Sequence, residues 1–250
     1  MKISIITATY NSAENIGPCV ESIISQSYTN IEHIIIDGNS SDNTLEKIKN
    51  YPYKPFKIIS EKDDGIYEAL NKGIKYATGD IVGFLHSDDF FANNEVIENI
   101  AQTFKTNDNI DAVYGDLEYI SQKNLTKTVR KWKSSPFKLK LLQKGWMPPH
   151  PTLYIKRNII NSFGGFDTKL KISADYMFIL KMFSQPNFNS KYIPKVFIKM
   201  RTGGISNKSL TKIILKSKED WIALRKNHFG FLNSFKVLFF KNISKFTQFF

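Results

Sequence analysis

Short apolar runs alternate with longer amphipathic segments along the first half of the chain. The runs are rich in isoleucine, valine or phenylalanine and cover residues 3–9, 31–37, 56–61 and 80–85. Such runs are typical of strands buried on both faces of a parallel sheet. Between them, apolar residues recur at helical spacing over residues 13–25, 42–50 and 66–77. The pattern predicts an α/β fold with a doubly wound, mainly parallel, Rossmann-like sheet.

Acidic residues follow these predicted strands: Asp37, the pair Asp63 and Asp64, and the pair Asp88 and Asp89. Ligands bind outside the carboxyl ends of the strands in open α/β sheets, so these acids face a crevice. The adjacent carboxylates of Asp88 and Asp89 repel each other, and a hard divalent cation such as Mg²⁺ between them would stabilise the pair. The alternative is a solvated turn in which Asp88 caps the helix that starts near Asn93.

Glycine-rich phosphate loops are absent from the sequence. No G-x-G-x-x-G follows the first predicted strand, and G-x-x-x-x-G-K-[ST] occurs nowhere. Dinucleotide oxidoreductases and P-loop NTPases therefore lose their main support. An acid-lined crevice suits a metal ion, ribose hydroxyls and base N–H groups instead.

The charge balance favours anionic partners. The 250 residues include 35 Lys and Arg against 23 Asp and Glu, a net charge of +12, and residues 205–250 alone carry +7. Nucleotides, lipid head groups and nucleic acid are such partners. Cys19 is the single cysteine, which fits a reducing compartment. The beginning of the sequence does not read as a signal peptide, and no run is long enough to span a bilayer, so we expect a cytoplasmic protein.

Four ordered segments carry a resemblance to a known family. They read IITATYN, IDGNSSD, DGIYEALNKG and FLHSDD, at residues 5–11, 36–42, 64–73 and 84–89. Together they resemble the family 2 glycosyltransferases of GT-A fold that build bacterial surface polysaccharides. The resemblance implies an inverting, metal-dependent transferase with a nucleotide-diphosphate sugar as donor and a saccharide, lipid-linked in many such systems, as acceptor. It ends near Lys208.

The resemblance also implies roles for single residues in the first half. Thr9 and Tyr10 would line the nucleotide pocket, Asp37 would accept a hydrogen bond from the base, and Asp63 would be a further nucleotide contact. A turn or helix-cap role is the alternative for Asp37. Asp88 and Asp89 match the acidic motif that binds Mn²⁺ or Mg²⁺, with Asp89 as direct ligand and Asp88 beside metal and nucleotide.

The sequence departs from the family pattern at His86, where many members carry an acid or Asn. This leaves the division of labour between Asp88 and Asp89 open. We interpret His86 as a packed polar side chain rather than a metal ligand.

The second half supplies the acceptor side. Residues 110–121 and 126–132 predict an antiparallel hairpin, and the prolines of residues 146–152 predict a shaped loop. His150 in that loop either contacts diphosphate or acceptor, or is a buried, hydrogen-bonded histidine. Ser173 is a good helix cap that places Asp175 in the first helical turn, where the resemblance implies the catalytic base.

Arg201 precedes a Gly-Gly-Ile-Ser segment at residues 203–206, which the resemblance implies is flexible and folds over the donor. Arg201 offers a cation for the leaving diphosphate. A solvated arginine on an ordinary surface turn is the alternative.

The organisation predicted from these features is a glycosyltransferase domain at 1–207, with a nucleotide-binding half at 1–109 and an acceptor-side half at 110–207, and a basic, Phe-rich helical tail at 208–250. The tail either lies peripherally on anionic lipid at the inner face of the plasma membrane, or packs on the core or on a second subunit. No nucleic-acid motif is present, so we expect no nucleic-acid partner.

Two other functions compete with the transferase. A sugar-nucleotide synthase would need a Gly-rich, cationic loop after the first strand, and residues 7–11 contain neither glycine nor cation. A non-catalytic basic protein that binds membrane or nucleic acid would need neither a metal nor the acids Asp89 and Asp175.

Overall fold

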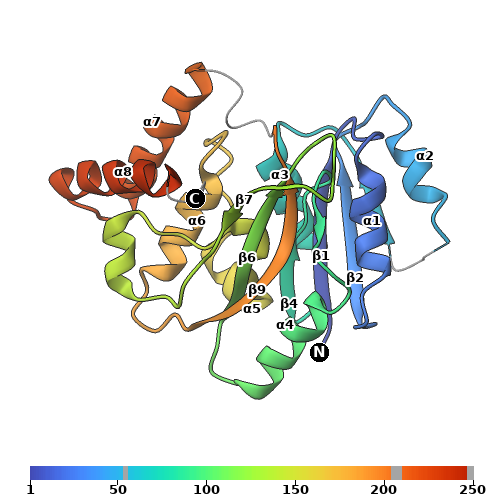
Figure 1. Ribbon diagram of the computed structural model, residues 1–250, viewed down its shortest axis with the longest axis horizontal. Helices are drawn as coiled ribbons and strands as arrows, with labels where there is room; N and C mark the ends of the chain where they lie inside the picture. Colours follow the sequence, from blue (N-terminus) through green and yellow to red (C-terminus); the bar gives the residue numbers. More distant parts are fainter. Residues whose placement is uncertain (53–55, 204–209, 247–250) are drawn as a thin grey trace.

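The computed structural model describes residues 1–52, 56–203 and 210–246. Within these residues the strands form one sheet in the order β3-β2-β1-β4-β8-β6-β9-β5, and β7 pairs with β6 (Figure 1). The strands are β1 Ile3–Thr9, β2 Ile31–Asp37, β3 Phe56–Ser60, β4 Ile81–Phe84, β5 Phe90–Phe91, β6 Ala112–Ile120, β7 Thr128–Trp132, β8 Tyr154–Lys156 and β9 Ser190–Arg201.

The nucleotide-binding half is built on parallel strands. β1 pairs in parallel with β2 and β4, and β2 pairs in parallel with β3. The register sets Thr9 opposite Asp37 and Asp37 opposite Ser60, so the strands end at one common edge. This edge is where the sequence predicts the crevice.

Antiparallel strands complete the sheet in the acceptor-side half. β8 pairs antiparallel with both β4 and β6, and β5 pairs antiparallel with β9. β6 and β7 form the predicted hairpin, with Leu117 opposite Trp132. β9 runs parallel to β6. The predicted α/β class with a mainly parallel sheet and a smaller antiparallel element is confirmed.

Helices cover the two faces of the sheet. They are α1 Ile16–Ile24, α2 Thr44–Lys49, α3 Ile66–Tyr76, α4 Val96–Thr106, α5 Arg157–Phe163, α6 Ala174–Phe183, α7 Leu210–Lys226 and α8 Phe231–Phe246, with 3₁₀ turns η1 Leu139–Lys144 and η2 His150–Thr152. Ile6 and Ile34 pack with α3 and α6 on one face, whereas Ile5 and Ile35 pack with α1 and α4 on the other. Isoleucine therefore fills both sides of the central strands, as their unbroken apolar runs indicate.

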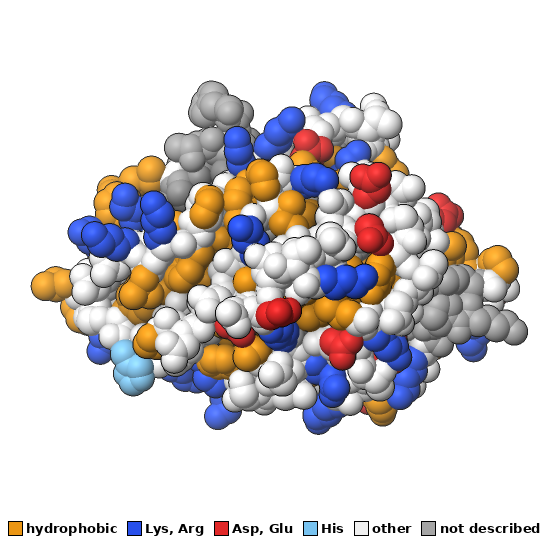
Figure 2. Space-filling view, turned by 90° about the horizontal axis from the view of Figure 1, so that it is seen from below, with side chains coloured by type: hydrophobic (Ala, Val, Ile, Leu, Met, Phe, Trp, Pro, Cys, Tyr) orange, Lys and Arg blue, Asp and Glu red, His pale blue; other side chains and the backbone are white. Residues whose placement is uncertain are grey.

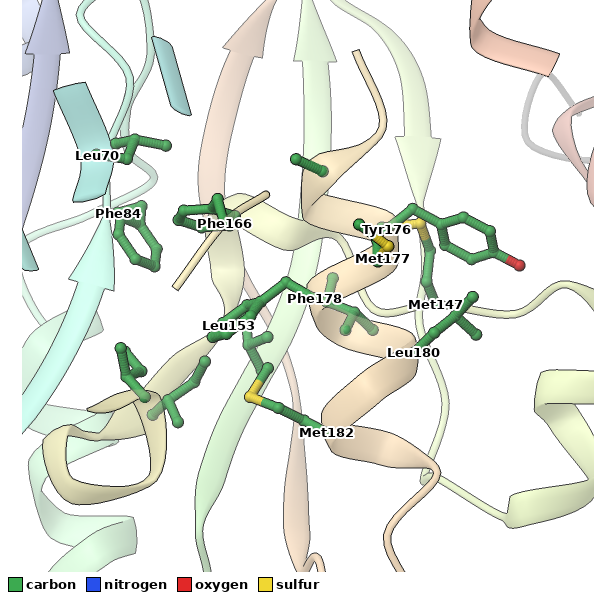
Figure 3. Close-up of a cluster of buried hydrophobic side chains, with 14 of the residues drawn as sticks. Leu70, Phe84, Met147, Leu153, Phe166, Tyr176, Met177, Phe178, Leu180 and Met182 are labelled. Carbon is green, nitrogen blue, oxygen red and sulfur yellow. The ribbon is translucent and has the colours of Figure 1, made fainter. Parts of the chain in front are cut away.

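A cluster of aromatic and aliphatic side chains joins α6 to the central strand β4 (Figure 3). The rings of Phe84 and Phe166 lie 5.3 Å apart between centroids, and those of Phe166 and Phe178 lie 5.0 Å apart. Figure 3 shows Leu70 of α3 on the same side of the cluster as Phe84. This packing fixes the start of α6 relative to the end of β4, and both ends carry predicted site residues.

Helices α7 and α8 lie at the end of the molecule opposite α2 (Figure 1). Ala223 and Leu224 of α7 and Val237 of α8 are buried in the same core as α6. Of the two alternatives for the tail, packing on the core is therefore realised by one face of these helices. The proposed boundary at residue 207 and the segment at residues 204–206 lie outside the described residues. None of the described helices is long and apolar enough to cross a bilayer.

Candidate active site

Four of the five residues predicted to bind the nucleotide, all except Asp88, meet at the ends of β1, β2 and β3. Thr9 is buried opposite Asp37, whereas the ring of Tyr10 is 64% exposed. A Cβ on Gly38 would lie 2.8 Å from Asp63 Oδ2 and 3.4 Å from the Tyr10 ring. A side chain at position 38 would collide with Asp63, so glycine lets Tyr10 and Asp63 lie close on either side of the backbone that follows Asp37.

Asp37 is fully buried and holds the turn after β2. Its carboxylate accepts hydrogen bonds from the backbone N–H of Ser40 at 3.0 Å, from the Ser40 hydroxyl at 2.5 Å and from the Ser60 hydroxyl at 2.7 Å. These contacts give Asp37 the turn-stabilising role that the sequence left as an alternative.

Asp88 and Asp89 follow β4 at the same edge. Asp88 is half-buried, and Asp89 is 1% exposed. Asp89 Oδ1 accepts a hydrogen bond from the Arg201 backbone N–H at 3.3 Å, while its Oδ2 is buried with no hydrogen-bond partner among the described residues. Burial raises the pKa of Asp89 well above its usual range, and the Asp88 carboxylate raises it further. Helix α4 begins only at Val96, so Asp88 does not cap it.

This acidic pair fits a divalent cation that is shared with a ligand. Within the described part of the chain, no group of three or more His, Cys, Asp or Glu side chains could hold a metal by itself. Mg²⁺ is commonly bound by one or two protein carboxylates together with substrate phosphates. The unpaired Asp89 Oδ2 beside Asp88 is the donor set that such a site needs.

Arg201 lies beside this pair at the end of β9. Its Nη1 donates to Asn15 Oδ1 at 2.6 Å, and its side chain is half-buried. The pairing of β5 with β9, with Phe90 opposite Lys199, brings the end of β9 next to Asp89. Arg201 is thus anchored near the acids, which differs from the alternative of a solvated surface arginine.

Asp175, the predicted base, lies in the first turn of α6 among residues from distant parts of the chain. Its Oδ2 lies 3.1 Å from His150 Nδ1, and its Oδ1 accepts a hydrogen bond from the Tyr67 hydroxyl at 3.2 Å. His150 Nε2 lies in turn 3.2 Å from His86 Nε2. The structure therefore unites the predicted residues Asp175 and His150, and it adds Tyr67 and His86.

The role of Tyr67 was missed because a tyrosine on an amphipathic helix has no distinctive local signal. The departure at His86 was visible in the sequence. Its partner, however, lies 64 residues away along the chain and is part of η2. The proline-rich segment also differs slightly from the predicted loop, because His150–Thr152 forms one 3₁₀ turn.

Charge states follow from these surroundings. Burial lowers the pKa of His150 to about 4, although the Asp175 carboxylate opposes this. Burial raises the pKa of Asp175, but His150, Lys216, the Tyr176 backbone N–H and Lys241 together hold it below its usual range. At neutral pH these shifts favour an ionised Asp175 and a neutral His150.

The segment that leads into α6 is held from another helix. Ser173 makes no side-chain capping bond, contrary to the prediction, and its hydroxyl is buried. Glu219 of α7 instead accepts hydrogen bonds from the backbone N–H groups of residues 171, 172 and 173, at 2.8, 2.8 and 2.9 Å. These N–H groups belong to the segment that leads into α6, whereas a Ser173 cap would accept N–H groups inside the first turn, so Glu219 holds the lead-in segment and does not replace the predicted cap.

Known proteins resemble this chain in sequence. The model of "Glycosyl transferase family 2" matches residues 4–169. The chain is 30% identical over 181 residues to the uncharacterized glycosyltransferase Rv1514c of Mycobacterium tuberculosis, covering 72% of this chain and 68% of the relative. It is 29% identical over 217 residues to the PGL/p-HBAD biosynthesis glycosyltransferase Rv2957 of the same species, covering 85% and 82%.

Solved structures share the fold. Residues 1–349 of Staphylococcus aureus TarS in complex with UDP-GlcNAc superpose with a TM-score of 0.73 at 18% identity, covering 95% of this chain and 70% of that one. The mannosyltransferase PcManGT of Pyrobaculum calidifontis, in complex with GDP-Man and Mn²⁺, superposes with a TM-score of 0.67 at 18% identity, covering 96% and 68%. With the family model matching well over half of its length, this chain belongs to glycosyl transferase family 2 and has the GT-A fold.

Proposed function

We propose that this transferase moves a sugar from a nucleotide-diphosphate donor to a saccharide acceptor, with inversion at the anomeric carbon. One observation carries the proposal: an ionised carboxylate, Asp175, is joined through two histidines to the strand end that bears Asp88 and Asp89. A base and an acidic metal motif in one continuous site are what direct displacement of a diphosphate requires.

The donor would occupy the edge formed by β1, β2 and β3. Exposed Tyr10 offers a stacking surface for the base, and Asp63 lies on the other side of Gly38. Thr9 and Asp37 are buried at the adjoining strand ends. Support comes from the fold relatives, since TarS is known with UDP-GlcNAc and PcManGT with GDP-Man and Mn²⁺. Mn²⁺ or Mg²⁺ held by Asp88 and Asp89 would neutralise charge on the diphosphate, and Arg201 would lie on the same side.

Asp175 would take the proton of the acceptor hydroxyl. The hydroxyl oxygen then forms a bond to the anomeric carbon while the bond from that carbon to the diphosphate oxygen breaks. The electron pair of the broken bond leaves with the nucleoside diphosphate, and the transition state has oxocarbenium character. A single displacement inverts the anomeric configuration, and no covalent enzyme intermediate forms.

Calorimetric binding of UDP, GDP, dTDP and CDP, with and without Mn²⁺ or Mg²⁺, tests the donor site. We expect the native chain to bind one nucleotide in a metal-dependent manner, and D89A to lose that binding. D175N is the matched control, because it should bind the nucleotide like the native chain but lose sugar transfer by roughly 100-fold or more. Absence of nucleotide binding under all conditions would overturn the proposal.

We further propose that the acceptor is lipid-linked, for cell-surface polysaccharide synthesis, and that α8 lies on the inner face of the plasma membrane. The face of α8 that points away from the core is strongly apolar: Phe231, Leu232, Phe235 and Phe239 are 59%, 81%, 56% and 62% exposed. Figure 2 shows hydrophobic and Lys or Arg side chains side by side at the left-hand end of the molecule, where α7 and α8 lie in Figure 1. Aromatic bulk beside cations suits anionic lipid, and like charge disfavours self-association of this face.

Co-sedimentation with vesicles tests the membrane proposal. The native chain should bind phosphatidylglycerol vesicles more strongly than phosphatidylcholine vesicles, and the triple variant F231S/F235S/F239S should bind neither. V129S changes an exposed apolar residue of β7, so it controls for loss of surface hydrophobicity alone. Equal binding by the triple variant would exclude α8 as the contact, and dimerisation lost in that variant would identify a protein interface instead.

A further inference from the structure

Three side chains form a continuous row between the predicted base and the acidic motif. Asp175 Oδ2 lies 3.1 Å from His150 Nδ1, and His150 Nε2 lies 3.2 Å from His86 Nε2. His86 stands two residues before Asp88, and Asp175 opens α6. Both ring nitrogens of His150 are thus engaged by protein side chains, so His150 acts on Asp175 rather than directly on a diphosphate.

The chemistry of the groups fixes the direction of these hydrogen bonds. An ionised carboxylate only accepts, so His150 must carry its proton on Nδ1. Neutral His150 then has a lone pair on Nε2, which accepts the Nε2–H of His86. The opposite tautomer of His150 would set two lone pairs against each other at the carboxylate. In that case His86 Nε2 would have to accept, and His86 would carry its proton on Nδ1. That nitrogen is buried without a hydrogen-bond partner among the described residues.

The backbone that carries the two histidines is constrained. Pro149 and Pro151 flank His150 and fix the local backbone. The Thr152 hydroxyl lies 3.0 and 2.8 Å from the carbonyl oxygens of Gly115 and Pro149. His86 follows the buried strand β4. These restraints keep the His150 ring beside Asp175.

We propose that His150 is a positioning residue that holds the Asp175 carboxylate in the orientation for taking the acceptor proton, and that His86 fixes the His150 tautomer required for this. The proposal rests on the role of Asp175 given above. Many family members have an acid or Asn at the position of His86. In this proposal His86 supports the base that takes the acceptor proton and does not bind the metal.

The proposal predicts a change in pH dependence as well as in rate. The charged or titratable groups around Asp175 are His150 on η2, Tyr67 on α3, Lys216 on α7 and Lys241 on α8, with His86 behind His150. Loss of the His150 N–H removes one donor that favours the ionised form of Asp175, and the others stay. The pKa of Asp175 should rise, so the acid limb of the kcat profile should move to higher pH.

The test compares H150F with H150N. Asn can place an N–H near the position of Nδ1, whereas Phe cannot donate. We expect H150F to lower kcat roughly 10- to 100-fold, the range found when a residue that orients a functional group is lost, with unchanged calorimetric affinity for the nucleotide. H150N should recover most of kcat and the native acid limb. Equal activity of H150F and native chain, or equal loss and an unmoved acid limb in both variants, would overturn the proposal.

Histidine tautomers give a readout that does not depend on turnover. The chain contains four histidines, so ¹⁵N-histidine spectra can be assigned by single substitutions. We expect the Nδ1–H tautomer for His150 and the Nε2–H tautomer for His86, with the His150 signals moving in D175N. The Nε2–H tautomer of His150 would refute the proposal that His150 donates to Asp175 and accepts from His86. Full activity of D175N would instead refute the role of Asp175 itself, so the two failures are distinguishable.

Discussion

At the scale of single residues, buried polar groups decide the chemistry of this protein. Asp37 is buried with hydrogen-bond donors around it, whereas Asp89 is buried with one oxygen unpaired among the described residues. A buried carboxylate that accepts several hydrogen bonds stabilises a turn, whereas a buried carboxylate oxygen without a donor would be stabilised by a bound cation. The same residue type therefore serves structure at the end of β2 and the proposed metal at the end of β4.

Replacing Asp37 tests how much its carboxylate contributes to the stability of the fold. D37A would leave the Ser40 N–H and the hydroxyls of Ser40 and Ser60 without their acceptor. We expect the free energy of unfolding to fall by about 1–3 kcal/mol, measured by urea denaturation. D37N, which keeps one acceptor oxygen, should lose less. A change below about 0.5 kcal/mol in D37A would show that the turn does not depend on this carboxylate.

His33 on β2 should make stability depend on pH. Burial lowers its pKa to about 3, and its Nε2 lies 2.9 Å from the Thr7 hydroxyl. Between pH 3 and 6.5 the unfolded chain binds a proton at His33 that the folded chain does not bind. Unfolding is therefore favoured as pH falls, and stability is lost below about pH 6.5.

The double variant T7V/H33L isolates this effect. The free energy of unfolding of the native chain should decline between pH 6.5 and 5, with a limit of about 1.4 kcal/mol per pH unit for one group. The decline should be smaller in the variant, because His33 no longer contributes. It should not disappear, because His86 and His150 still contribute. Identical slopes in urea titrations of both chains would contradict a neutral, buried His33.

At the scale of elements, helix α7 organises the start of α6. Glu219 is 4% exposed and accepts the backbone N–H groups of residues 171–173, two positions before Asp175. Of these groups the Ser173 N–H is one of those that have no partner within the helix, and the other two fix the segment before it. A tail helix thereby supports the helix that carries the proposed base.

Removing Glu219 should affect stability and activity together. In E219A we expect a loss of about 1–3 kcal/mol in the free energy of unfolding, because the backbone N–H groups of residues 171–173 lose their acceptor. Sugar transfer should fall more than nucleotide binding, because the first turn of α6 loses its support. K218A, the exposed neighbour on α7, is the matched control and should change neither quantity. Native-like transfer by E219A would show that Asp175 keeps its place without this support.

The sequence of helix α8 does not indicate which of its faces is buried. Its apolar residues surround much of the helix, so the sequence suggested imperfect amphipathicity. In the structure Val237 is buried in the core, while Phe231, Phe235 and Phe239 are exposed. The helix therefore has two apolar faces, one occupied by the protein and one proposed to be occupied by lipid.

At the scale of the whole molecule, the site spans both halves of the sheet. Asp89 follows β4, Arg201 ends β9 and Asp175 lies in the first turn of α6. The Phe84–Phe166–Phe178 packing connects β4 to α6, and the pairing of β5 with β9 brings Arg201 to Asp89. A ligand that contacts both halves stabilises the folded chain as a unit.

Ligand binding should accordingly raise thermal stability. At a nucleotide concentration of 100 times Kd in the presence of Mn²⁺, linkage gives about 2.7 kcal/mol of additional stability, seen as a higher Tm. Chelation with EDTA should remove most of the shift for the native chain, and D89A should show little shift with or without Mn²⁺. A shift of equal size after chelation would show that the nucleotide binds without metal.

Local residue patterns were sufficient for the parallel half of this protein. The strands and helices from β1 to β4 are encoded by apolar periodicity, which needs only neighbouring residues, whereas the two-residue strand β5 was not predicted. Because parallel strands end at one edge, the acids Asp37, Asp63, Asp88 and Asp89 could also be placed together. Boundaries differed by a few residues, as in α1, which starts at Ile16 rather than Ala13.

Contacts between distant residues required the folded chain. His86 and His150 are 64 positions apart, and Glu219 lies 46 positions after the Ser173 N–H that it accepts. No periodicity links such pairs, because they meet only when β4, η2, α6 and α7 pack on one another. Hydropathy likewise could not distinguish the core face of α8 from its exposed face, since both are apolar. Short-range pattern therefore encodes the elements and their shared edge, while long-range packing alone decides the partners of the proposed base.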